Sequence, residues 1–379
     1  MDDALALGFT KAFPGGPEIS ADLEIDTRSP RVTVLFGPSG TGKTTLLRII
    51  AGLESPTTGF VRYRQETWVD IAQGIHISPQ QRRVGFLFQD YALFPHLSVE
   101  RNIAYGLHSV SRAEAARRVQ DLLERFQLQG LAKRYPAQLS GGQKQRVALA
   151  RTLALEPRVL LLDEPLSALD GPTREAVRGD LSGWLHTLGI PVLIVTHDRT
   201  EALALGDDMA VMDEGRILQH GPVDEIFRQP ANQSVAQVVG VETVVAGHLL
   251  EVSEGMAKVV VGQTVLSASS ANLSADQSAV FVCIRAEDVI LVKGDEFPQA
   301  SPRNRMPSIV KALIREGPMF RIHLDCGFPL SALLTRQACD ELDLKPGDPI
   351  VAMVKAPNVH LVPRDVRRSA KADSSEGLE

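Results

Sequence analysis

Residues 31–53 read RVTVLFGPSGTGKTTLLRIIAGL, and this stretch decides the fold of the 379-residue chain. The apolar run at 31–36 predicts a buried strand, and the segment from about Lys43 predicts a helix. Between them, GPSGTGKT fits the phosphate-loop pattern G-x-x-x-x-G-K-[S/T] in full, with the strand before it and the helix after it that the pattern requires. We therefore expect the chain to bind the phosphates of a nucleotide.

The phosphate loop supplies the predicted nucleotide contacts. Its glycines let successive backbone N–H groups turn toward the phosphates, at a helix N-terminus whose dipole favours anions. Lys43 is expected to neutralise charge on the β- and γ-phosphates of ATP, and the Thr44 hydroxyl to bind Mg²⁺. The residues assigned to nucleotide binding in this loop are Gly37, Pro38, Ser39, Gly40, Thr41, Gly42, Lys43, Thr44 and Thr45.

Two further apolar runs predict strands of the same sheet. They are RVLLL at 158–162 and PVLIVT at 191–196. Short continuous apolar runs separated by helical stretches are typical of a parallel sheet covered on both faces. Residues 1 to about 235 are therefore expected to form an α/β nucleotide-binding core, with a helical subdomain at about 90–155.

Polar side chains follow these strands, at the ends where α/β sheets handle ligands. Asp163 suits Mg²⁺, usually through water, and the adjacent Glu164 suits the orientation and deprotonation of an attacking water. His197 follows the third strand, and Gln89 follows an apolar run in FLFQDYALFP. For these last two residues, a purely structural role is an equally open interpretation.

A second phosphate-binding element is LSGGQ at 139–143, with a hydroxyl, two glycines and an amide leading into a helix. A phosphate loop encloses only one side of a triphosphate, so another helix N-terminus can close the outer face of the γ-phosphate. Two chains packed head to tail, each lending LSGGQ to the other, form a closed twofold dimer around two nucleotides. We expect a homodimer for this reason.

The set of motifs resembles that of the ATP-binding cassette (ABC) ATPases. GPSGTGKT, Gln89, LSGGQ, LLLDEP, SALD and THD occur in that family's order and rough spacing, over about residues 5 to 235. The resemblance implies that Gln89 senses Mg²⁺ and water, and that His197 is a switch beside the γ-phosphate. The residues that it implies act across the dimer are Ser140, Gly141, Gly142, Gln143 and Asp170. Phe13 is the candidate for stacking on adenine, and Phe9 competes with it.

Beyond about residue 235 the chain changes to short alternating segments rich in Val, which is the period of half-buried strands. IRAEDVILV at 284–292 and VKAPNVHLV at 354–362 share a basic residue, Ala, Val, Leu and Val at the same offsets. We expect two related OB-like β modules, at 236–297 and 298–365, and a polar tail at 366–379.

The second module resembles the oxyanion-binding (TOBE/Mop) module of molybdate importer ATPases. Ser301, Asn304, Lys355 and Ala356 stand where such modules offer donors to molybdate or a related oxyanion. Pro302 departs from the Ser-Ala-Arg-Asn of that family and removes one N–H. A purely structural or dimerising role is the alternative for both modules.

Charge and hydropathy limit the partners. A net charge of -6 and a pI of about 5.9 show no electrostatic footprint for nucleic acid. No apolar run approaches the roughly 20 residues that span a bilayer, and the acidic N-terminus is not a signal peptide. We expect the chain at the cytoplasmic face of the inner membrane, peripherally bound through permease subunits that receive a substrate-binding protein.

The leading hypothesis is an ATP-hydrolysing subunit that energises import of an oxyanion, with molybdate first. Sulfate, ferric-iron, polyamine or sugar import is the alternative, because the cassette motifs are common to all of these importers. Two hypotheses belong to other classes: a soluble cassette ATPase of DNA repair or translation, and an oxyanion-sensing regulatory ATPase. The first lacks support in the sequence, which has one cassette and no heptad insertion between Thr44 and Leu139.

Overall fold

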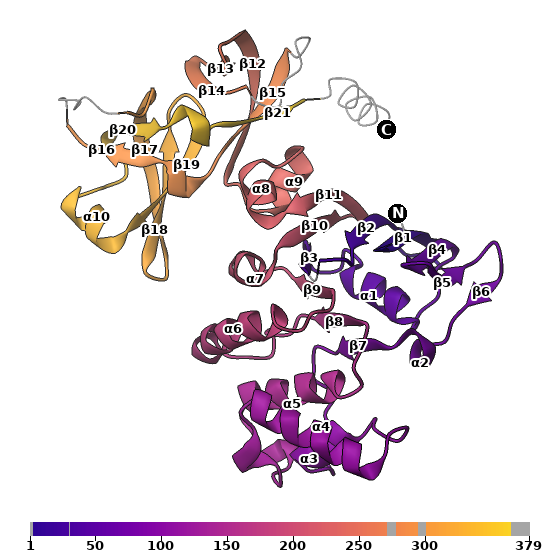
Figure 1. Ribbon diagram of the computed structural model, residues 1–379. Coiled ribbons are helices and arrows are strands. Elements are labelled where there is room, and N and C mark those ends of the chain that lie inside the picture. Colours follow the sequence, from indigo (N-terminus) through magenta and orange to yellow (C-terminus); the bar gives the residue numbers. More distant parts are fainter. Residues whose placement is uncertain (1–2, 30, 271–277, 295–300, 365–379) are drawn as a thin grey trace. The chain divides into compact units, whose positions relative to one another are not determined.

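The computed structural model describes residues 3–29, 31–270, 278–294 and 301–364 (Figure 1). The chain divides into two compact units, Met1–Ile226 and Phe227–Glu379. The predicted polar tail at 366–379 lies outside the described residues.

The first unit contains one large sheet and the helices around it (Figure 1). Its strands are β1 (Ala4–Lys11), β2 (Ile19–Asp26), β3 (Val32–Phe36), β4 (Thr58–Tyr63), β5 (Glu66–Asp70), β6 (Ile75–His76), β7 (Val84–Leu87), β8 (Val159–Asp163), β9 (Val192–Thr196), β10 (Asp208–Asp213) and β11 (Arg216–Pro222). Its helices are α1 (Lys43–Ala51), α2 (Pro79–Arg82), α3 (Val99–Ala104), α4 (Arg112–Arg125), α5 (Gly141–Leu153), α6 (Gly171–Leu185) and α7 (Arg199–Leu205), with 3-10 turns η1 (Gln129–Leu131) and η2 (Pro136–Gln138).

The sheet order is β6-β5-β4-β1-β2-β11-β10-β3-β9-β8-β7. Its parallel part, β10-β3-β9-β8-β7, contains the three predicted strands as β3, β8 and β9. Every residue of these three strands is buried, as the continuous apolar runs predict. The antiparallel strands at the other side of the sheet were not part of the prediction, which rested on the motif-bearing runs alone.

The parallel strands carry helices on both faces. Leu160 and Leu162 of β8 pack in one cluster with side chains of α5, α6 and α7. Val159 and Leu161, which point the other way, pack with side chains of α1. The predicted sheet covered on both faces is therefore confirmed.

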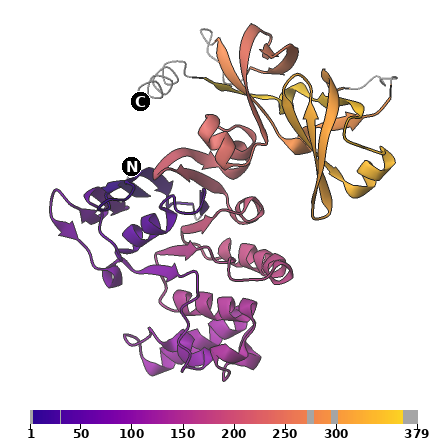
Figure 2. The same cartoon turned by 180° about the vertical axis from the view of Figure 1, so that it is seen from behind.

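Helices fill the predicted subdomain at 90–155, all of which is described. It holds α3, α4 and α5 with the turns η1 and η2, grouped beyond the edge strand β7 (Figure 2). Side chains of α4 and α5 join the cluster that covers β8, so one core continues from the sheet into this group.

The second unit consists of short helices followed by two five-stranded antiparallel sheets. The orders are β14-β13-β12-β15-β21 and β16-β20-β17-β18-β19. The strands are β12 (Thr243–Ser253), β13 (Met256–Val261), β14 (Thr264–Ser269), β15 (Ala279–Ile284), β16 (Ile290–Val292), β17 (Asn304–Glu316), β18 (Met319–Asp325), β19 (Pro329–Thr335), β20 (Pro349–Val354) and β21 (His360–Pro363). The helices are α8 (Val223–Arg228), which crosses the boundary between the units, α9 (Gln233–Val238) and α10 (Arg336–Glu341), with turns η3 (Ala286–Asp288) and η4 (Ala356–Asn358).

The two repeats exchange their last strands, which the expected consecutive division at 297/298 did not anticipate. Each repeat forms a strand, a 3-10 turn and a second strand that leaves for the other sheet. β16 therefore pairs with β20, and β21 pairs with β15. The turns meet at equivalent positions, where Asn358 Nδ2 donates to Asp288 Oδ1 at 2.6 Å.

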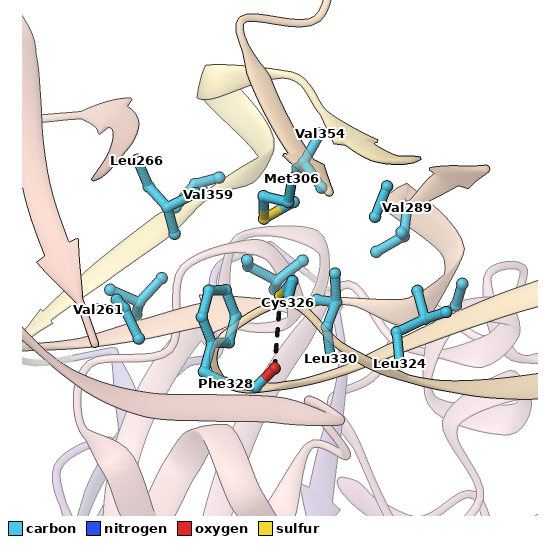
Figure 3. Packing of buried hydrophobic residues seen from close by; sticks show 14 of the residues in the cluster. Val261, Leu266, Val289, Met306, Leu324, Cys326, Phe328, Leu330, Val354 and Val359 are labelled. Carbon is cyan, nitrogen blue, oxygen red and sulfur yellow. Dashed lines mark hydrogen bonds between the residues drawn. The ribbon is translucent and has the colours of Figure 1, made fainter. Parts of the chain in front are cut away.

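The exchange gives the two sheets one shared core. Figure 3 shows Val261 and Leu266 of the first sheet packed with Met306 and Leu324 of the second. Val289 and Val359, which follow the two turns at equivalent positions, are 5% and 0% exposed in this core. The repeated Val is thus an inward position just before each crossing strand.

Asn304 joins the sheets by hydrogen bonds. Its side chain donates from Nδ2 to Ser267 O at 2.8 Å, and its Oδ1 accepts from Ser267 N at 2.6 Å. Asn304 is 3% exposed, so both amide atoms serve the edge strand β14.

We expect Asn304→Ala to lower the local stability of this junction. The substitution leaves the Ser267 N–H and carbonyl without their partners, which costs about 1–3 kcal/mol. Hydrogen exchange of the β14 amides, measured on the full chain, should become faster. Ser301→Ala is the matched control at an exposed position, and equal protection in both variants would contradict the assignment.

Candidate functional site: a nucleotide-binding edge of the sheet

The phosphate loop connects β3 to α1 and depends on two close approaches of the backbone. A Cβ on Gly37 would lie 2.0 Å from the carbonyl oxygen of Met212. Gly42 adopts φ 101 at the start of α1, and a Cβ there would lie 2.5 Å from Ile19. The loop between them, Pro38 to Gly40, is exposed. These glycines are therefore needed for the loop to fit against β10 and β2.

Lys43 lies at the centre of this loop. Its ammonium donates to Gly37 O at 2.8 Å and to Pro38 O at 2.6 Å, and it also lies 3.4 Å from Thr41 Oγ1. Burial lowers the pKa of Lys43, while the negative charges of Glu164 and Asp163 oppose this shift. The buried ammonium of Lys43 donates to carbonyl oxygens here, and it can donate to phosphate oxygens instead when a nucleotide binds.

The two predicted Mg²⁺ ligands meet. Thr44 Oγ1 in the first turn of α1 donates to Asp163 Oδ1 at the end of β8, at 2.8 Å. Asp163 is 6% exposed, and burial raises its pKa, an effect that the Thr44 hydrogen bond opposes. Thr45 follows in the same turn and is half-buried.

The donor set fits Mg²⁺ rather than a metal held by protein alone. Among the described residues there is no group of three or more His, Cys, Asp or Glu side chains able to hold a metal ion. A hydroxyl and one carboxylate oxygen are hard ligands, and Mg²⁺ commonly takes one or two of these and completes its octahedron with water and phosphate oxygens. Thr44 and Asp163 provide such a pair.

Glu164 stands next to this pair in an uncommon backbone conformation. Its φ of 44 lies in the left-handed region, and its N–H donates to Val195 O at 3.1 Å. Left-handed geometry at a non-glycine residue is costly and is frequent at functional sites. It turns the Glu164 side chain, which is 19% exposed, toward two polar partners.

Those partners are Gln89 and His197. Gln89 Nε2 donates to Glu164 Oε2 at 3.1 Å, and His197 Nδ1 lies 3.3 Å from Glu164 Oε1. The structure thus brings three of the predicted residues together around one carboxylate. Gln89 contacts Glu164, the neighbour of the Asp163 that Thr44 binds, and its role toward Mg²⁺ stays a prediction.

The LSGGQ element forms the start of α5. Ser140 Oγ accepts from Gln143 N at 3.3 Å, and Gln143 Oε1 accepts from Ser140 N at 3.0 Å, which makes a capping box. Cβ atoms on Gly141 and Gly142 would lie 2.7 Å from Leu169 and 2.9 Å from Val177, so the glycines let α5 pack closely on the SALD turn and α6. The predicted phosphate contacts are thus also helix caps within the chain.

Asp170 has a similar place at the next helix. Its side chain accepts from Thr173 N at 3.0 Å and caps α6, and hydrogen bonds to Thr173 lower its pKa. A residue that caps a helix in one chain can still face a second copy, because the carboxylate is exposed.

The adenine candidates differ in their burial. Phe9 is 3% exposed in the core on β1, so its ring is not available to a ligand. Phe13 lies half-buried in the loop between β1 and β2, with the Lys11 ammonium 5.3 Å from its ring centroid. Phe13 is the one of the two that can stack on a base.

The candidate oxyanion residues of the second unit lie at the adjoining ends of β17 and β20, where Asn304 pairs with Val354, the residue before Lys355. Asn304 uses both amide atoms on Ser267. Ser301 and Lys355 are exposed, and Ala356 is buried in the turn η4.

Sequence reasoning missed Arg151, at the far end of the α5 helix that LSGGQ begins. Its guanidinium donates to Ala92 O at 2.7 Å and to Tyr91 O at 2.9 Å, just after Gln89. It also stacks over Phe94, 5.3 Å from the ring centroid. This residue connects the LSGGQ helix to residues 89–107, which we call the Gln89 segment. Only the tertiary contacts reveal the connection.

A small polar cavity of about 120 Å³ adjoins Glu164 and His197. Thr196 Oγ1 donates to Glu201 Oε2 at 2.6 Å beside it, and Glu201 is 5% exposed. Arg174 from α6 also lines the cavity. Glu201 and Arg174 lie outside the motifs identified from the sequence.

In the part of the chain that the structure describes, no helix combines the length and the apolar character of a membrane span.

Two protein-family models match the chain. One, described as ABC transporter, matches residues 21–167, and one, described as TOBE domain, matches residues 300–361. The first match includes the phosphate loop, LSGGQ and LLLDEP. The second covers the strands β17 to β20 and reaches into β21.

Relatives of known name match over most of the chain. The sulfate/thiosulfate import ATP-binding protein CysA of Methylococcus capsulatus is 40% identical over 355 residues, which are 90% of this chain and 94% of that protein. The spermidine/putrescine import ATP-binding protein PotA 1 of Pseudomonas aeruginosa is 45% identical over 245 residues, 62% of this chain and 64% of that protein. The structure of cbiO1 from Clostridium perfringens, described as part of the ABC transporter complex cbiONQ, matches with a TM-score of 0.53 and 29% identity, over 64% of this chain and 96% of that one.

We expect Glu164→Gln to reduce ATP hydrolysis by at least about a hundredfold, since the amide cannot accept a proton from water. Binding of ATP should persist, because Lys43 and Thr44 are untouched. Phosphate release and nucleotide binding on the purified chain measure the two effects separately. Glu175→Gln, an exposed position on α6, is the matched control, and a Glu164→Gln variant with wild-type turnover would exclude the assigned role.

Proposed function

The chain belongs to the ABC transporter ATPases, and we propose that it is the ATP-hydrolysing subunit of a bacterial importer for a tetrahedral oxyanion. The match to the sulfate/thiosulfate import protein carries this proposal, because its 40% identity extends over 90% of the chain and therefore beyond the first unit. The polyamine import protein matches over only 62% of the chain.

Sulfate or thiosulfate is the cargo that the comparisons favour, rather than the molybdate expected first from the sequence. The molybdate expectation rested on the resemblance of the C-terminal module alone. Molybdate, a tetrahedral dianion like sulfate, is the second candidate. A polyamine is a cation, whereas sulfate and molybdate are anions. Polyamine import is the weaker alternative, because the polyamine import protein matches a smaller part of the chain.

Hydrolysis would be carried out at the edge of the sheet where β3, β8 and β9 end. We assign Lys43 to the β- and γ-phosphates, to which its ammonium would turn from the carbonyls of Gly37 and Pro38. Mg²⁺ held by Thr44 and Asp163 would supply charge neutralisation to the phosphates. Glu164 would accept the proton of the attacking water.

Gln89 and His197 would orient this reaction from both sides of Glu164. Each contacts a different carboxylate oxygen, so together they limit the rotation of the side chain. His197 is 55% exposed and is therefore free to face the γ-phosphate. The adenine would stack on Phe13.

A second copy of the chain would complete the site. The capping box keeps Ser140 and Gln143 in place at the start of α5, where the first N–H groups of a helix have no partner within it. The N–H groups at this helix start, together with Gly141 and Gly142, would contact the γ-phosphate bound by the partner copy. Asp170 would lie beside them, because Gly141 packs on the neighbouring Leu169.

Permease subunits would bind at the Gln89 segment, at the cytoplasmic face of the inner membrane, with a substrate-binding protein on the other side. The aromatic pair Phe94 and Tyr105, whose centroids are 4.1 Å apart, lies in this segment, and Tyr105 is 48% exposed. An exposed aromatic next to a helix end is suited to contact a partner helix. Arg151 would transmit the contact to LSGGQ.

An oxyanion-sensing role of the second unit is the second candidate function, because two exposed cations, Arg303 and Lys355, lie just outside the adjoining ends of β17 and β20. In the first repeat Ala286 N donates to Glu242 Oε2 at 3.1 Å. Glu242 precedes the residue that pairs with Ile284, and Arg303 precedes the residue that pairs with Val354. Ile284 and Val354 begin the two repeated segments, so Glu242 and Arg303 occupy equivalent positions. The second repeat therefore has Arg303 where the first has the Glu242 carboxylate, and it has the exposed Lys355 where the first has the buried Arg285.

We expect a strain without this chain to lose uptake of labelled sulfate, and the wild-type gene but not Glu164→Gln to restore it. Labelled thiosulfate, molybdate and spermidine in the same strains identify the cargo. Loss of spermidine uptake with sulfate uptake unchanged would exclude an oxyanion importer.

The sensing role is decided in the same strains. If the second unit senses the anion, excess sulfate inhibits uptake by the wild type but not by Lys355→Met, and uptake at low sulfate is equal in both. Equal inhibition of both would exclude Lys355 from such a role.

We expect Ser140→Arg to block ATP-driven dimerisation while the monomer still binds ATP, because the arginine enters the surface that faces the partner's γ-phosphate. Size-exclusion chromatography with ATP, in a Glu164→Gln background that prevents hydrolysis, measures the dimer. Loss of ATP binding to the monomer would instead place LSGGQ at the nucleotide of its own chain.

A further inference from the structure

The turn that carries His197 is anchored by a buried carboxylate. Thr196 Oγ1 donates to Glu201 Oε2 at 2.6 Å and accepts from Asp198 N at 3.1 Å. Asp198 Oδ1 in turn accepts from Glu201 N at 3.0 Å and caps α7. Because Thr196 and Glu201 are 2% and 5% exposed, this network holds the backbone on both sides of His197.

The guanidinium of Arg174 faces this network from α6. It lines the same cavity as Glu164, His197, Asp198 and Glu201. Its Nη2 donates to Leu169 O at 2.9 Å, one residue before Asp170. Its Nε is fully buried and has no hydrogen-bond partner among the described residues, so the charge is held in place by the turn and by the acids across the cavity.

Ser167 extends the connection to Glu164. Its hydroxyl donates to Glu164 O at 2.8 Å, and it also lines the cavity. The turn from 167 to 170 is therefore bound to Glu164 at one end and to Arg174 at the other.

We propose that Arg174 is a positioning residue for hydrolysis, which couples the turn at 167–170 to the buried Glu201 carboxylate and through it to the His197 turn. The idea rests on the proposed roles of Glu164, His197 and Asp170. When Asp170 contacts a second copy, the turn at 167–170 moves and Arg174 moves with it. Arg174 thereby changes the position of His197 beside Glu164.

Charge supports the coupling. Burial raises the pKa of Glu201, while the Thr196 hydrogen bond and the charge of Arg174 lower it. The other charged groups around Glu201 are Asp198, which raises the pKa, and His197, which lowers it. Glu164 also borders the cavity. Loss of the guanidinium should therefore raise the pKa of Glu201 further.

The test compares Arg174→Met with Arg178→Met, one turn along the same helix, in the ATPase reaction of the full chain. We expect Arg174→Met to lower kcat about tenfold and to leave KM for ATP within about twofold, since the phosphate loop is untouched. Arg178→Met should stay within about twofold of wild type in both. Arg174→Lys, which keeps the charge, should recover part of kcat.

Glu201→Gln separates coupling from general loss of packing. In that background Arg174→Met should cost less than about twofold, because the two side chains act on one network. The acid limb of the kcat–pH profile should move to higher pH in Arg174→Met, and should not move when Gln replaces Glu201. These readouts report on function even if the melting temperature falls in every variant.

An effect of Arg174→Met that is equal in both backgrounds, or equal to that of Arg178→Met, would overturn the proposal. Failure of the proposed chemistry has a different signature. Hydrolysis that survives Glu164→Gln would exclude Glu164 as the base. The hydrolysis rates of Arg174→Met and Arg178→Met would still test the role of Arg174 in that case.

Discussion

The hydrogen bond between the Thr44 hydroxyl and the Asp163 carboxylate is the constraint on which the rest of the first unit depends. It joins the first turn of α1 to the end of β8, two segments 119 residues apart in the chain, at 2.8 Å, and Asp163 is 6% exposed. A buried carboxylate needs such a partner. Once β8 ends at this point, Glu164 is placed beside the phosphate loop, and its left-handed backbone turns the side chain to Gln89 and His197.

The elements that are assigned to a second copy are also satisfied within one chain. Ser140 and Gln143 cap α5, and Asp170 caps α6, so these helices form without a partner. Gly141 and Gly142 let the two helices approach closely at this point. The dimer would then add a ligand to surfaces that are already ordered, which keeps the entropic cost of association low. Arg151 and Arg174 connect these helices to the residues around Glu164.

In the second unit, the repeated segments act as crossing points. Each leaves its sheet after a 3-10 turn and completes the other sheet, so neither half can bury its apolar face alone. Asn304 and the Asp288–Asn358 pair close the junction with hydrogen bonds. The Asn304 amide, a candidate anion ligand, thereby forms structural hydrogen bonds, and Arg303 and Lys355 are exposed cations beside it.

The sequence by itself determined the parallel core, the phosphate loop and the polar residues at the strand ends, because continuous apolar runs and glycine spacing are local signals. It also indicated the repeat, since equal offsets of Val and Leu mark equivalent inward positions. Only the tertiary structure decided which residues meet: Gln89 with Glu164, and Arg174 facing Glu201. It also decided that Phe13, and not Phe9, is the accessible ring. Strand exchange in the second unit was likewise decided there. Such contacts join residues far apart in the chain, and their partners follow from packing that no local pattern records.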